Sequence, residues 1–160
     1  MIISDKEELK DIIEDAKKAW KSVLIKKGVF DIVHPGHVFA IKMFAKEADI
    51  VIILTQSDEF TAKKKGSSRP INPQRQRTEV VDGIAGVDYT YPDKSNSREE
   101  YIEFLNYLKP TILAVTSVDE KKTKDYSSSF WELKEFPDKA QPWYSTTEII
   151  NRVLEKCSNK

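Results

Sequence analysis

The stretch Gly28-Val-Phe-Asp-Ile-Val-His-Pro-Gly-His37 lies between an apolar run, Val23–Ile25, and a helical pattern that starts at Val38. The run predicts a strand and the pattern predicts a helix, so the stretch is a strand-to-helix turn. Both histidines of the chain, His34 and His37, fall within it. Because the first N–H groups of a helix lack internal partners and carry partial positive charge, such a turn favours phosphate binding. We therefore expect the active site at this turn.

The sequence on either side of the turn alternates strand patterns with helix patterns. The nearly continuous apolar run 49–56 is typical of a strand that is covered on both faces. A strand, a helix and a strand in this order predict a right-handed parallel crossover. Strands are expected at 23–29, 49–56, 88–91 and 111–116, an edge strand at 131–136, and helices at 5–20, 38–46, 77–85, 98–108 and from about 145 onward.

Serine residues mark the expected starts of three helices. Ser4 and Ser145 each stand three positions before a glutamate, which matches the capping box, and Ser97 is expected to cap the helix over 98–108. Together the elements predict an α/β fold, a Rossmann-like doubly wound sheet of three or four mainly parallel strands in a single domain. Its expected parts are an N-terminal helix within 1–21, an α/β core over 22–156 and a tail at 157–160.

The composition bounds the environment and the partners. The chain has 160 residues, of which 26 are basic and 26 acidic, so no overall charge attracts nucleic acid or a membrane surface. No apolar run reaches the length of a membrane span, and the first residues lack a signal-peptide pattern. The single cysteine, Cys157, has no internal disulfide partner. These features indicate a cytoplasmic protein that binds neither nucleic acid nor membrane.

A basic, mostly polar stretch, Ser57–Arg77, follows the second strand and is expected to be largely loop until the helix near its end. Because it follows a parallel strand, it lies at the edge of the sheet where α/β proteins bind ligands, which favours an anionic substrate. Lys26 and Lys27 end the first strand and face either the site or solvent, with equal support. The basic residues of the stretch are Lys63, Lys64, Lys65, Arg69, Arg75 and Arg77.

The two histidines are better suited to phosphate than to metal. A zinc site usually needs three or four protein ligands, and the chain has no third histidine. The intervening Pro35-Gly36 makes a regular helical pair of histidines improbable. Two imidazole donors beside a glycine fit contact with phosphate oxygens. The hydroxyls of Ser145, Thr146 and Thr147 at a second helix start either cap that helix or bind anions, and the two roles are compatible.

Residues 28–37 resemble the signature of the cytidylyltransferase-like nucleotidyltransferases, whose hallmark is His-x-Gly-His preceded by Gly-x-Phe-Asp. The run Ser145–Ile150 resembles the second signature of this family, a Ser/Thr run followed by two isoleucines. Residues 65–73, Arg77 and 87–89 are most similar to the adenylyltransferase domain of ADP-heptose synthase. The resemblance covers roughly residues 5–155 and is poor over 117–142.

The resemblance implies transfer of a nucleoside monophosphate from an NTP to a small phosphorylated substrate, with release of pyrophosphate. The implied catalytic residues are His34, His37 and Lys65. The implied nucleotide-binding residues are Gly28, Val29, Phe30, Asp31, Gly36, Arg77, Ser145, Thr146 and Thr147, with Phe30 open to a core-packing role and Arg75 an alternative to Arg77. The family also implies Mg²⁺ brought with the NTP, no dedicated protein metal site, and a homodimer.

Two departures from the family leave the acceptor and the base open. The ADP-heptose enzymes carry Lys-Gly-Gly-Asp after the fourth strand, where this chain reads Val115-Thr-Ser-Val-Asp119. Tyr144 stands where some cytidylyltransferases have arginine. The best-matching activity is a heptose 1-phosphate adenylyltransferase of carbohydrate metabolism. The alternatives are a cytidylyltransferase for glycerol 3-phosphate or a similar alcohol, an FAD synthetase, and a non-catalytic nucleotide-binding regulatory module.

Overall fold

The computed structural model describes residues 1–116, 124, 126–136 and 145–158. Within them, one all-parallel sheet has the strand order β3-β2-β1-β4-β5. This confirms the doubly wound α/β fold, with five strands where three or four were expected, and the predicted edge strand is β5. The strands are β1 (Val23–Gly28), β2 (Ile50–Thr55), β3 (Tyr89–Pro92), β4 (Ile112–Val115) and β5 (Glu132–Glu135).

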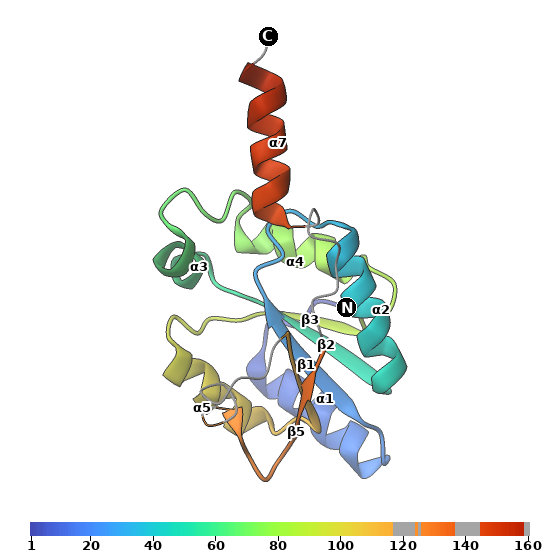
Figure 1. Cartoon of the computed structure of the whole chain (residues 1–160). Coiled ribbons are helices and arrows are strands. Elements are labelled where there is room, and N and C mark those ends of the chain that lie inside the picture. The colour runs from blue at the N-terminus through green and yellow to red at the C-terminus, as the bar shows by residue number, and fades with distance from the viewer. Residues whose placement is uncertain (117–123, 125, 137–144, 159–160) are drawn as a thin grey trace.

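Helices cover both faces of the sheet (Figure 1). Helices α1 and α5 lie on one face and α2 and α4 on the other, whereas α7 extends away from the body of the molecule (Figure 1). None of the helices formed by the described residues is both long enough and apolar enough to cross a membrane. The helices are α1 (Lys6–Lys18), α2 (Pro35–Glu47), α3 (Asp58–Lys65), α4 (Gln74–Asp82), α5 (Arg98–Leu108) and α7 (Thr146–Ser158).

The alternation of strand side chains divides the core into two layers. Ile25 and Ile52 join the cluster that packs under α1 and α5, whereas their neighbours Leu24 and Val51 join the cluster under α2 and α4. Each central strand therefore buries both of its faces, which explains why β1 and β2 read as continuous apolar runs.

Three features differ from the sequence-based expectations. The polar stretch 57–77 contains α3, whose few buried side chains, Phe60 and Thr61, give no apolar periodicity to detect. The cap of α1 is Asp5 rather than Ser4, because its carboxylate accepts hydrogen bonds from the next turn at 2.8 and 3.0 Å. Helix α7 continues to Ser158, so the expected tail at 157–160 begins inside a helix. Most of the loop expected after β4 lies outside the described residues.

The sheet forks between β1 and β4. These strands pair at only two positions, and the last pair is Ile25 with Leu113. Beyond it, β1 stays paired with β2 as far as Gly28, while β4 stays paired with β5 as far as Val115. In a doubly wound sheet this is the point where the strand order reverses, and ligands bind in the crevice that opens there.

Gly28 ends β1 directly beneath an aromatic ring. Phe30 has a φ of 52°, in the left-handed region that non-glycine residues seldom adopt, and this turns its ring back over the strand end. A Cβ at position 28 would lie 2.6 Å from Cε2 of Phe30. The absence of a side chain at Gly28 therefore makes room for the Phe30 ring.

We predict that Gly28→Ala lowers the free energy of unfolding by about 1–3 kcal/mol, because the buried Phe30 ring must move to admit the methyl group. Urea unfolding followed by circular dichroism measures the change. Gly83→Ala is the matched control, since Gly83 has a φ of −77° and its nearest atom to an added Cβ lies at 3.6 Å. Equal stabilities of the two variants would contradict the prediction.

Candidate active site

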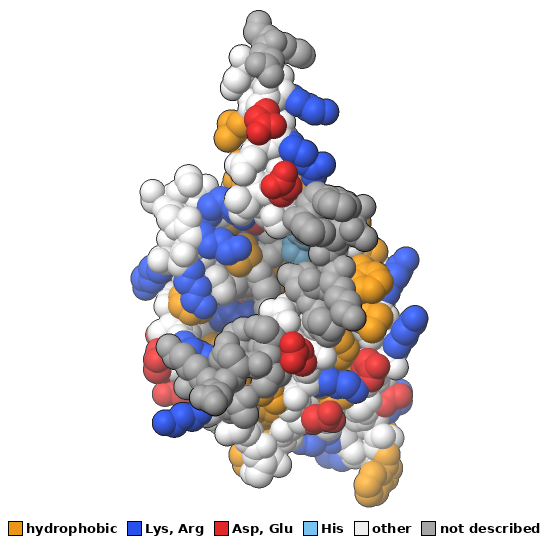
Figure 2. All heavy atoms as spheres, in the orientation of Figure 1, with side chains coloured by type: hydrophobic (Ala, Val, Ile, Leu, Met, Phe, Trp, Pro, Cys, Tyr) orange, Lys and Arg blue, Asp and Glu red, His pale blue; other side chains and the backbone are white. Residues whose placement is uncertain are grey.

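A cavity of about 500 Å³ lies at the fork, on the α2 side of β1. We call it the histidine cavity. Three parts of the chain that are distant in sequence meet around it: the start of α2, the end of α3 and the start of α7. Among the residues predicted for the site, its walls include Gly28, Phe30, His34, Gly36, His37, Lys65, Ser145, Thr146 and Thr147. In the space-filling view, a histidine surface is visible below α7, with Lys and Arg side chains gathered beside it (Figure 2).

The histidine pair sits on the first turn of α2. The helix begins at Pro35, so His34 is its N-cap and His37 lies in its first turn. The helix starts three residues earlier than expected, because proline is well tolerated at the first helical position. His34 itself is extended, with a φ of −141°, so the two histidines do not form a regular pair within the helix. The two imidazole rings stack with centroids 3.8 Å apart, and the Phe30 ring lies 5.0 Å from that of His37.

His37 is neutral over the physiological pH range. Burial, followed by the nearby positive charges of His34 and Lys65, lowers its pKa from 6.5 to about 4. Its Nδ1 is buried and has no hydrogen-bond partner within the described part of the chain. An anion in the cavity would favour the protonated imidazole, because an opposite charge stabilises the charged form.

Lysine and hydroxyl groups complete the polar wall. Lys65 is the last residue of α3, and burial together with the charge of Arg69 lowers its pKa. The Ser145 hydroxyl accepts a hydrogen bond from the Glu148 N–H at 3.1 Å, as the capping box requires. Cationic and hydroxyl donors therefore face the same space as the start of α2, an arrangement that suits several phosphate groups.

Asp31 supports the site without lining it. It is buried, and its carboxylate accepts from Arg69 Nε at 2.7 Å and from the Ile71 and Asn72 N–H groups at 2.9 Å. Burial alone would raise the pKa of Asp31, but these hydrogen bonds and the Arg69 charge lower it overall. Its contacts fix the loop that follows α3, directly after Lys65.

Arg77 has a structural role that the sequence did not predict. The sequence placed it among the nucleotide-binding residues, but its side chain is fully buried. Its guanidinium donates to the carbonyl groups of Val29, Gln56 and Asn72 and to the Asp58 carboxylate. These contacts tie the ends of β1 and β2 to α3 and α4, and Arg77 is not among the described residues that line the histidine cavity. Val29 likewise contributes through its carbonyl.

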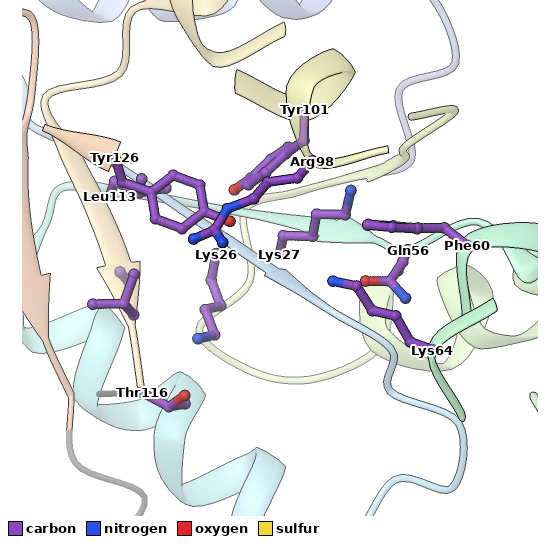
Figure 3. Close-up of a pocket in the computed structure, with 12 residues that line it drawn as sticks. Lys26, Lys27, Gln56, Phe60, Lys64, Arg98, Tyr101, Leu113, Thr116 and Tyr126 are labelled. Carbon is purple, nitrogen blue, oxygen red and sulfur yellow. The ribbon is translucent and has the colours of Figure 1, made fainter. Parts of the chain in front are cut away.

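A second cavity, of about 280 Å³, lies on the α5 side of the fork (Figure 3). We call it the cationic cavity, because its charged lining residues are Lys26, Lys27, Lys64 and Arg98. Lys26 and Lys27 extend in opposite directions from β1, as successive strand residues do (Figure 3). The sequence left these two lysines undecided and did not single out Arg98 or Tyr126. For Lys26 and Lys27, the alternation of side chains along β1 was the one sequence feature that could have indicated their directions.

We predict that Arg77→Met lowers the free energy of unfolding by at least about 3 kcal/mol, because it removes donors from three carbonyl groups and a partner from Asp58. Arg75→Met is the control and should cost less than about 1 kcal/mol, since Arg75 is 89% exposed and its ion pair among the described residues is with Glu79 on its own helix. Urea unfolding compares them. If the Arg77→Met protein were as stable as wild type, the structural role would be wrong and Arg77 would again be a candidate for nucleotide binding.

We also predict a pH dependence of stability that arises from His37. Below pH 6.5 the unfolded chain protonates this residue, whereas the folded chain does so only near pH 4. Its contribution to the free energy of unfolding is therefore complete above pH 6.5 and is lost progressively as the pH falls toward 4. Urea unfolding at pH 7 and pH 5 should show a smaller loss for His37→Asn than for wild type. Equal losses would mean that His37 titrates normally in the folded protein.

The sequence is similar to those of two bacterial proteins named bifunctional protein HldE. Over 96 residues, 60% of this chain and 20% of the relative, the sequence is 36% identical to the bifunctional protein HldE of Actinobacillus pleuropneumoniae serotype 5b. It is 30% identical over 107 residues to HldE of Desulfatibacillum aliphaticivorans, covering 67% of this chain and 21% of the relative. The chain thus spans about a fifth of the length of these relatives.

Two solved structures share the fold. The lipopolysaccharide core biosynthesis protein from Thermoplasma volcanium matches with a TM-score of 0.54 and 24% identity, over 64% of this chain and 82% of that one. Pantoate-beta-alanine ligase from Francisella tularensis matches with a TM-score of 0.65 and 16% identity, over 97% and 78% respectively. The model of the cytidylyltransferase-like family matches residues 25–152. The chain therefore belongs to the cytidylyltransferase-like family of nucleotidyl-transferring enzymes.

Proposed function

We propose that the protein transfers a nucleoside monophosphate from an NTP to a sugar phosphate, and that it forms ADP-heptose from ATP and heptose 1-phosphate. The observation that carries the proposal is the meeting of three phosphate-binding elements in the histidine cavity: the His34–His37 turn, Lys65 and the Ser145–Thr147 run. The similarity to HldE supports the choice of acceptor and of adenine.

In the proposed reaction, an oxygen of the acceptor phosphate attacks the α-phosphorus of the NTP. A new P–O bond joins the acceptor to the nucleoside monophosphate, the bond between the α-phosphorus and the αβ-bridging oxygen breaks, and pyrophosphate leaves with the electron pair. Such a transfer needs positioning and charge stabilisation rather than a covalent enzyme intermediate. In this scheme His34 and His37 contact the triphosphate, and Lys65 holds the α-phosphate or the acceptor phosphate.

The hydroxyls of the Ser145–Thr147 run are proposed to bind the β- and γ-phosphates at the start of α7. Gly28, Phe30 and Gly36 would shape the nucleotide side of the cavity. Phe30 does this from within the core, since it is 6% exposed and supports the His37 ring. Thr116, which follows β4, also lines this cavity, and the next residues of the chain lie outside the described part of the structure.

Mg²⁺ is proposed to enter with the NTP. No group of three or more His, Cys, Asp or Glu suited to a metal ion occurs in the part of the chain that the structure describes. The described lining of the histidine cavity also contains no carboxylate. Phosphate oxygens and water would therefore supply most Mg²⁺ ligands, as is common for this ion, and it would neutralise phosphate charge there. A cytoplasmic homodimer remains our proposal for the setting of the enzyme.

The test is pyrophosphate release from each of ATP, CTP, GTP and UTP, combined in turn with heptose 1-phosphate, glycerol 3-phosphate and FMN. We expect the fastest release with ATP and heptose 1-phosphate. CTP with glycerol 3-phosphate, or ATP with FMN, would reassign the acceptor within the family. Tight NTP binding without release from any pair would instead indicate a regulatory module.

We predict that His37→Ala lowers kcat of the active pair by at least about a hundredfold, as the loss of one preorganised transition-state donor does. Circular dichroism should show an unchanged fold. Lys42→Ala is the matched control, because Lys42 is exposed on the same helix and does not line either cavity. Wild-type kcat in His37→Ala would remove the histidine turn from the mechanism.

A further inference from the structure

The cationic cavity is lined by basic side chains to which the proposed NTP site assigns no role. Four basic side chains line it, and no Asp or Glu does so within the described residues. It meets the histidine cavity at the fork, where Lys26, Lys27 and Thr116 line both spaces. A ligand in one cavity therefore lies next to a ligand in the other.

One of its cations is fixed in place by a buried carboxylate. Lys27 forms an ion pair with Asp93, and both side chains are almost fully buried. Asp93 is held in turn by the Ser95 N–H and hydroxyl, at 3.1 and 2.7 Å. The Lys27 ammonium also lies 4.3 Å from the centre of the Tyr101 ring. Burial lowers the pKa of Lys27, although the Asp93 charge opposes this. These contacts hold the Lys27 side chain in one position at the edge of the cavity.

Lys64 is the second cation of the cavity, and the charged groups that shift its pKa are both positive. Burial, then the charges of Lys27 and Arg98, lower the pKa of Lys64. Its ammonium lies 4.0 Å from the centre of the Phe60 ring, and it forms no ion pair with a described carboxylate. Like charges held together in a cavity repel one another, and an anion between them would relieve that repulsion.

The aromatic walls favour an anionic group over a nucleotide base. Phe60 and Tyr101 already face lysine ammonium groups, and the Arg98 guanidinium lies 4.8 Å from the centre of the Tyr126 ring. A cation that lies over a ring competes with a base for that face of the ring. In Figure 3 the Arg98 guanidinium lies beside the Tyr126 ring, the Lys27 ammonium lies on the side of Tyr101 and Phe60, and Lys64 extends into the pocket from α3.

We propose that the cationic cavity binds the phosphate dianion of the acceptor, with Lys64 and Arg98 as its direct contacts and Lys27 as a fixed charge behind it. The proposal rests on the proposed function, since it names the site of the second substrate. Arginine and lysine together suit phosphate, because a guanidinium donates two parallel hydrogen bonds and an ammonium adds a point charge. Acceptors without a phosphate should bind poorly.

The first test uses tungstate as a phosphate probe in crystals of the full chain grown with a non-hydrolysable ATP analogue. Anomalous density between Lys64 and Arg98 is expected in wild type and should be absent in Lys64→Met. Lys63→Met is the matched control, because Lys63 is the adjacent residue on α3 and pairs with Glu59 on the helix surface. It should keep the peak. Absence of tungstate from the cavity in wild type would overturn the proposal, and this readout does not depend on turnover.

The second test uses the active NTP and acceptor pair found by pyrophosphate release. Lys64→Met and Arg98→Met should each raise the KM of the acceptor about tenfold or more, as expected for the loss of a charge-assisted hydrogen bond, with the KM of the NTP nearly unchanged. Lys63→Met should leave both constants unchanged. Turnover with unaltered acceptor KM in Lys64→Met and Arg98→Met would sink this inference while the proposed function stands. Tungstate in the cavity without turnover of any acceptor would sink the function alone.

Discussion

The separation of β1 from β4 after the Ile25–Leu113 pair determines where this molecule can bind anything. Up to that pair the sheet is continuous and buried on both faces. Beyond it each strand keeps one neighbour and loses the other, so side chains of both branches line open space. The fork is a consequence of chain order, because the crossover through α5 brings β4 to the opposite side of β1 from β2. Both cavities follow from this single break in pairing.

The residues that line the cavities are held in position by buried polar residues that do not line them. Asp31 and Arg77 are buried, and between them they accept from or donate to the backbone at 29, 56, 71 and 72. Such groups stabilise only while every partner is in place, since an unpaired buried charge is costly. The loop and helix starts are therefore set before any ligand arrives, which reduces the ordering that binding requires.

The sequence predicted the fold well because its central strands are apolar on both faces and because Ser97 and Ser145 mark the starts of two helices. It missed α3, whose surface is polar and whose only large buried side chain is Phe60. It placed the histidine turn and Lys65 at one edge of the sheet, since parallel strands end at the same edge. It could not separate Arg77 from the neighbouring arginines, because burial depends on how α4 packs rather than on local pattern. Nor could it predict that Lys26 and Lys27 line both cavities, because that depends on the fork between β1 and β4.

The stack of Gly28, Phe30 and His37 has a consequence for how this site changes over evolutionary time. A side chain at position 28 fits only if the ring at position 30 moves or becomes smaller, and that ring also packs against His37. The three positions are therefore not free to drift one at a time. A first substitution at 28 lowers stability, and replacement of the ring at 30 removes one of the two rings that pack against His37. Neutral variation is expected to accumulate around this stack rather than within it, so the geometry of the turn is inherited as a unit.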